Sequence, residues 1–67
     1  MKTKEAIKKY NHAENIIRKV YPGISAIRRA EEIERLLSAM YGDDESDEII
    51  DLVFANEFYP IGLNKNE

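Results

Sequence analysis

The sequence predicts an all-α fold: a small three-helix domain made of an antiparallel helical hairpin plus a shorter third helix, with a short C-terminal tail. Apolar residues recur at steps of three and four in three segments, which is the period of one helical face. Pro22, Gly23 and Gly42 separate these segments, and such residues end helices. A chain of 67 residues is expected to be one domain, and its 43% of hydrophobic residues can form a packed core.

The first helix is predicted over residues 3–21. Its apolar face carries residues at helical spacing, namely Ala6, Ile7, Tyr10, Ala13, Ile16, Ile17, Val20 and Tyr21. Thr3 is the expected N-cap, because its hydroxyl can accept a hydrogen bond from a free backbone N–H of the first turn. Two acid–base pairs at i,i+4 spacing should add helix stability. They are Glu5–Lys9 and Glu14–Arg18.

The second helix is predicted over residues 25–41, with Ser25 as N-cap and Gly42 as its C-terminal stop. Its apolar stripe consists of Ala26, Ile27, Ala30, Ile33, Leu36, Leu37, Met40 and Tyr41. Glu31 and Arg35 form a further i,i+4 pair on the outer face.

The connection between these two helices is short, so we expect them to form an antiparallel hairpin. Two small residues on the facing stripes, Ala13 and Ala30, would allow the helices to approach closely.

The third helix is predicted over residues 46–58, with Ser46 or a neighbouring aspartate as its cap. The carboxylates that precede it suit the positive end of the helix dipole. Its apolar face comprises Ile49, Ile50, Val53 and Phe54, and Phe58 extends it. The tail, residues 59–67, has no helical period.

Charge is divided unevenly along the chain. Residues 1–30 contain eight basic and two acidic side chains, whereas residues 31–67 contain two basic and eleven acidic ones. The two halves can therefore attract each other, within one molecule or between neighbours. The absence of cysteine is typical of a cytoplasmic protein and excludes disulfides, and the N-terminal residues predict neither a secretory signal nor a membrane-spanning helix.

A basic face is predicted on the first helix, opposite its apolar stripe. It is formed by Lys4, Lys8, Arg18 and Lys19. Cations along one ridge can contact phosphates. An ordinary solvated surface is the simpler interpretation.

An acidic ridge is predicted on the third helix, where Asp44, Asp47, Glu48 and Asp51 share one face. A solvated helix start explains it best, because the dipole favours carboxylates there. A cation site, a docking surface for a basic partner and mimicry of a phosphate backbone are the alternatives.

Further interaction residues are predicted at the edges of the apolar stripes. Arg29 lies beside the stripe of the second helix, where a carboxylate such as Glu57 is a conceivable partner. The most apolar end of the chain carries Phe58, Tyr59, Ile61 and Leu63. This segment either packs on its own bundle or completes the core of a partner.

Enzymatic activity is not expected. The single histidine, His12, falls on the polar side of the first helix, and no residue at helical spacing would orient it. The sequence suggests no catalytic residue, metal site, cofactor or small-molecule substrate.

The sequence therefore favours a protein–protein interaction module that self-associates as a homodimer, because so short a chain buries little surface alone. The uneven charge favours an antiparallel pairing of the two copies. The alternative is a nucleic-acid-associated regulator of phage or mobile-element type that uses the basic face. Residues 30–37 (AEEIERLL) and 47–52 (DEIIDL) resemble the helices that precede the DNA-reading unit of small sigma-like phage regulators.

Overall fold

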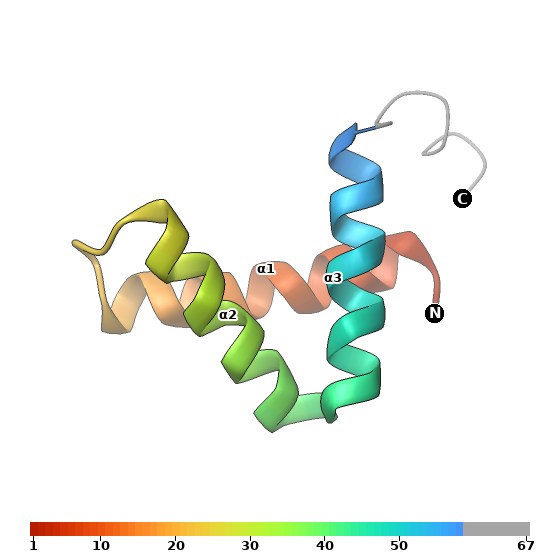
Figure 1. The fold of residues 1–67 in the computed structure, drawn as a ribbon, viewed down its shortest axis with the longest axis horizontal. Coiled ribbons are helices and arrows are strands. Elements are labelled where there is room, and N and C mark those ends of the chain that lie inside the picture. The colour runs from red at the N-terminus through yellow and green to blue at the C-terminus, as the bar shows by residue number, and fades with distance from the viewer. Residues whose placement is uncertain (59–67) are drawn as a thin grey trace.

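The structure, a computed structural model, describes the backbone of residues 1–58 and the side chains of residues 1–56. It confirms the predicted all-α class (Figure 1). Three helices follow one another: α1 (Thr3–Val20), α2 (Ala26–Tyr41) and α3 (Asp43–Phe58). The tail predicted over residues 59–67 lies outside the described residues.

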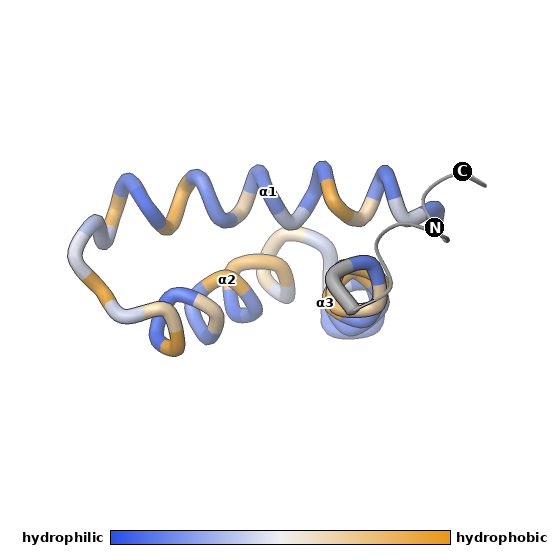
Figure 2. The backbone as a smooth tube through the Cα atoms, turned by 90° about the horizontal axis from the view of Figure 1, so that it is seen from above, coloured by the Kyte–Doolittle hydropathy of each residue, from blue (hydrophilic) through white to orange (hydrophobic). Residues whose placement is uncertain are grey.

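The helices form two layers. In the front layer of Figure 1, α2 and α3 make a V whose closed end is at Gly42, and α1 crosses behind both. Figure 2 shows the same layers from above, with α1 on one side and α2 and α3 on the other. Each helix contacts the other two. These contacts are consistent with the predicted hairpin, although α2 crosses α1 obliquely.

Two of the predicted helix ends are confirmed. The Ser25 Oγ accepts a hydrogen bond from the backbone N–H of Arg28 at 3.2 Å, as an N-cap does. Gly42 ends α2 with φ +90° and ψ 160°, and its N–H donates to the carbonyl of Ser38 at 2.9 Å. This backbone region is essentially restricted to glycine, and it allows α3 to start at the next residue.

Two other ends differ from the prediction. Thr3 is the first residue of α1 rather than its cap; Lys2 holds the cap position and makes no side-chain capping bond. Similarly, α3 begins at Asp43, so Ser46 lies inside the helix and α3, with 16 residues, is as long as α2. An acidic first turn starts α3, where the helix dipole favours negative charge.

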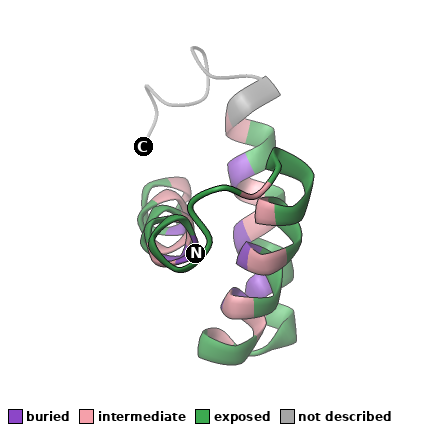
Figure 3. Ribbon diagram, turned by 90° about the vertical axis from the view of Figure 1, so that its left-hand side faces the viewer, coloured by how far each residue is buried: buried purple, intermediate pink, exposed green. Residues whose placement is uncertain are grey.

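The core lies between the two layers, toward which the buried positions turn (Figure 3). It is formed by Ala6, Ala13, Ile17, Ile33, Leu37, Ile49 and Val53, all of them on predicted apolar faces. Two of the seven are alanines, so the core is small. Ala13 is buried as expected, but Ala30 is exposed and does not support a close approach of α1 and α2.

No helix within the described residues combines the length and the apolar character needed to cross a membrane.

Candidate functional site

An apolar groove opens where α2 and α3 diverge from Gly42. It has a volume of about 280 Å³. Ile27 and Ala30 line it from α2, Ile50 and Phe54 from α3, and Tyr10 from α1. We call it the α2–α3 groove.

The groove walls carry large apolar side chains that the described residues leave partly exposed. Ile27 is 78% exposed and Phe54 is 45% exposed. The volume lies just below the range of typical small-molecule pockets. The groove is therefore better suited to the apolar side chains of a partner than to a buried metabolite.

The rim of the groove is acidic. Glu31 and Glu34 line it from α2, and both are exposed. Neither forms an ion pair with another described residue. A lining that combines apolar side chains with carboxylates favours a partner that presents apolar side chains next to cations, although Arg35 lies beside the same carboxylates in an adjoining hollow.

A second apolar surface lies at the connection between α1 and α2, which we call the apex (Arg18, Lys19, Val20 and Tyr21). Val20 is 58% exposed and Tyr21 is 46% exposed. Both line a shallow hollow of about 320 Å³ on the other side of α2. Its remaining lining is both apolar and charged, and from α2 it comprises Glu32, Arg35, Leu36 and Ala39. Arg18 and Lys19 occupy the last turn of α1, where the helix dipole favours cations.

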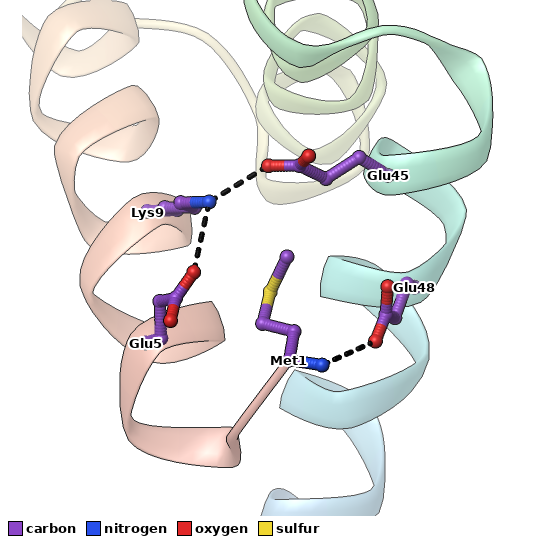
Figure 4. Close-up of polar contacts among 5 residues, drawn as sticks. All are labelled: Met1, Glu5, Lys9, Glu45 and Glu48. Carbon is purple, nitrogen blue, oxygen red and sulfur yellow. Dashed lines mark hydrogen bonds and ion pairs between the residues drawn. The ribbon is translucent and has the colours of Figure 1, made fainter.

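The uneven charge of the sequence has an effect within the chain (Figure 4). Lys9 Nζ lies 2.7 Å from a carboxylate oxygen of Glu45 in α3 and 3.1 Å from one of Glu5. The hydrogen bond to Glu45, followed by that to Glu5, raises the pKa of Lys9 above its ordinary value. Lys9 Nζ also lies 4.8 Å from the ring centre of Tyr41, which is cation–π distance.

The N-terminal ammonium group of Met1 forms a second link of this kind. It lies 3.0 Å from a carboxylate oxygen of Glu48 (Figure 4). Glu48 belongs to the predicted acidic ridge, whose four members are all exposed. Neither this contact nor Lys9–Glu45 follows a helical spacing, so only the general attraction between the two halves, and not these particular pairs, was predictable.

The residues of the predicted basic face, Lys4, Lys8, Arg18 and Lys19, are all exposed on α1. The predicted pairs Glu5–Lys9 and Glu14–Arg18 are both present, at 3.1 Å. The predicted pair of Arg35 with Glu31 is wrong, since Arg35 instead lies 3.4 Å from Glu32.

Arg29 is partly buried, as its position beside the stripe suggested, but its partner in the structure is Glu14 at 3.8 Å. The side chain of the conceivable partner Glu57 lies outside the described residues. The same holds for Phe58, Tyr59, Ile61 and Leu63, so their predicted roles stay predictions.

Sequence reasoning missed the groove because it assigned Ile27 and Phe54 to the apolar faces that form the core. A weak signal was available in α2. Glu31 and Glu34 lie one and two turns after Ile27 on the same side of the helix, so this edge of the stripe borders water.

Among the described residues, no group of three or more metal-ligating side chains converges, and His12 is exposed. Comparison with known proteins identifies no relative: no family model matches the chain, nor does any curated protein or solved structure.

Proposed function

We propose that this chain is a non-enzymatic helical interaction module that self-associates as a homodimer. The observation that carries the proposal is the α2–α3 groove, where Ile27 is mostly exposed and Phe54 is partly exposed. Apolar side chains gathered around one hollow mark an interaction site more often than scattered ones do.

The size of the core supports the same conclusion. Among the described residues seven hydrophobic side chains are buried, and small domains of this kind gain stability by burying further apolar surface against a partner. Complete burial of one isoleucine side chain contributes about 1.5–3 kcal/mol. Covering Ile27 alone would thus strengthen association by roughly tenfold or more.

Sedimentation velocity across a range of protein concentrations tests the proposal. We expect a species of twice the 7.8 kDa chain mass that dissociates on dilution. Ile27→Ser should weaken the dimer by roughly tenfold or more. Met40→Ser is the matched control, because Met40 is also an exposed apolar residue of α2 but does not line the groove. A chain that stays monomeric at every concentration would refute self-association.

One observation favours a second candidate, a nucleic-acid-associated regulator. The basic face (Lys4, Lys8, Arg18 and Lys19) is exposed along α1. Two features weigh against it: Arg18 is paired with Glu14, and α3 presents the exposed acidic ridge. A mobility-shift assay at low salt tests this candidate, because phosphate contacts are strongest there. The absence of a shift would exclude it.

A further inference from the structure

We infer that the α2–α3 groove of one copy receives the apex of a second copy, and that the contact is made twice about a two-fold axis. The inference rests on the proposed self-association and assigns its surface. It is carried by two apolar surfaces that the described residues leave partly exposed. Glu31 and Glu34 line the groove, whereas the cations Arg18 and Lys19 lie beside Val20 and Tyr21 at the apex, whose hollow is also lined by Glu32 and Arg35.

The groove and the apex match in chemistry. The groove combines an apolar floor with the carboxylates of Glu31 and Glu34. The apex presents Val20 and Tyr21 beside two cationic side chains of the last turn of α1. Tyrosine suits such a site, because its ring can enter the apolar floor while its hydroxyl stays near the polar rim. The cations orient the encounter of the two surfaces.

The groove and the apex of one chain cannot meet. The groove borders Ala30 and Glu34 of α2, whereas the hollow lined by Val20 and Tyr21 borders Leu36 and Ala39 of the same helix. The body of α2 therefore separates the two surfaces, and a second copy is needed to bring them together.

The geometry suits a two-fold arrangement. The apex ends at Tyr21, and Ile27 of the first turn of α2 lines the groove, so both surfaces flank the same helix end. Figure 1 shows that the connection from α1 leads directly into this end of α2. A two-fold axis near this turn would place each apex over the groove of the other copy. In such an interface, a contact between residue i of one copy and residue j of the other is repeated with the two copies exchanged.

Charge reversal provides the test. The rim variant carries Glu31→Lys and Glu34→Lys, and the apex variant carries Arg18→Glu and Lys19→Glu. In either variant alone, rim and apex have the same sign, so each should be monomeric where the wild type is dimeric. In an equimolar mixture both contacts pair opposite charges again, and a heterodimer of twice the chain mass should form.

A control variant separates this effect from net charge. The control carries Lys4→Glu and Lys8→Glu on the same helix. Each reversal lowers the net charge by two units, so the control has a net charge of −7, as the apex variant does, instead of the −3 of the wild type. This control should dimerise like the wild type. The helix content of every variant is checked by circular dichroism, because Arg18→Glu also removes the exposed pair with Glu14.

A variant without charge change gives an independent measurement. Tyr21→Ser should weaken the wild-type dimer by roughly tenfold, which corresponds to about 1.4 kcal/mol. Tyr21 is 46% exposed, and circular dichroism checks that the variant keeps its helix content.

The outcomes separate the inference from the proposed function. A dimeric wild type whose rim and apex variants also dimerise, or whose mixture fails to recover, would overturn the inference but leave self-association intact. If the mixture forms species larger than a dimer, the contact joins successive copies in an open chain and the two-fold arrangement is wrong. A monomeric wild type would refute the proposed function itself.

Discussion

Ser46 tests how much a buried polar group in the core lowers the stability of the fold. Its side chain is completely buried, and its Oγ has no hydrogen-bond partner. A buried hydroxyl that lost its bonds to water and gained none destabilises the fold by about 1–3 kcal/mol. Ser46→Ala removes this hydroxyl and keeps the Cβ.

The expected gain follows from three contributions. Removing the unpaired hydroxyl contributes about 1–3 kcal/mol, and the better helix propensity of alanine adds roughly 0.5 kcal/mol. The missing oxygen leaves a small gap, which costs part of that gain through lost contacts. We expect a net increase of about 1 kcal/mol in the free energy of unfolding, or roughly 4–8 °C in Tm for a domain of this size.

Urea denaturation followed by circular dichroism measures this change. Protein concentration is held constant, because a dimer is stabilised by mass action. Ser38→Ala is the matched control: Ser38 lies within α2 and is only partly buried, so its substitution reports helix propensity without a fully buried hydroxyl. If Ser46→Ala stabilises no more than Ser38→Ala, the reasoning about the unpaired hydroxyl is wrong.

Three further predictions concern helix ends and the tertiary ion pair. Gly42→Ala should lower the free energy of unfolding by about 1–3 kcal/mol in urea denaturation, because φ +90° with ψ 160° is strained for any side chain. Ser25→Ala should cost about 1 kcal/mol through loss of the cap, whereas Thr3→Ala should cost far less; equal losses would contradict the assigned caps. The bonds to Glu45 and Glu5 raise the pKa of Lys9 in the folded state, so their stabilisation is complete below the ordinary pKa of 10.5 and is lost as pH rises through the folded-state pKa. As pH rises through the folded-state pKa of Lys9, the urea midpoint of Lys9→Gln should therefore fall less than that of the wild type. If the two midpoints fall in parallel, the bonds of Lys9 do not stabilise the fold in this way.

The helical period predicted which segments are helices and most of the core. Ile33 and Leu37 lie four residues apart on one face, as do Ile49 and Val53, and all four are buried. The period shows which face of each helix is apolar, but it does not determine the angle at which two helices cross. Because α2 and α3 diverge from Gly42 (Figure 1), the described residues leave Ile27 78% exposed.

Local capping was predictable only where one residue type is strongly required. Gly42 holds a conformation that other residues rarely adopt, and Ser25 immediately follows a break in the helical pattern. The start of α3 was ambiguous because several residues there can cap a helix. Gly42 determines the outcome, since its conformation allows α3 to begin directly at Asp43 and carries Ser46 into the core.

The uneven charge acts differently at the two ends of the molecule. At the N-terminal end of α1, Lys9 and the ammonium group of Met1 pair with carboxylates of α3, so attraction there stabilises the monomer. At the other end, Lys19 and the groove carboxylates form no ion pair with described residues, and helix α2 lies between them. These exposed charges are screened by salt more strongly than partly buried pairs are. If the chains associate as proposed, rising salt should therefore weaken their association before it weakens their folding.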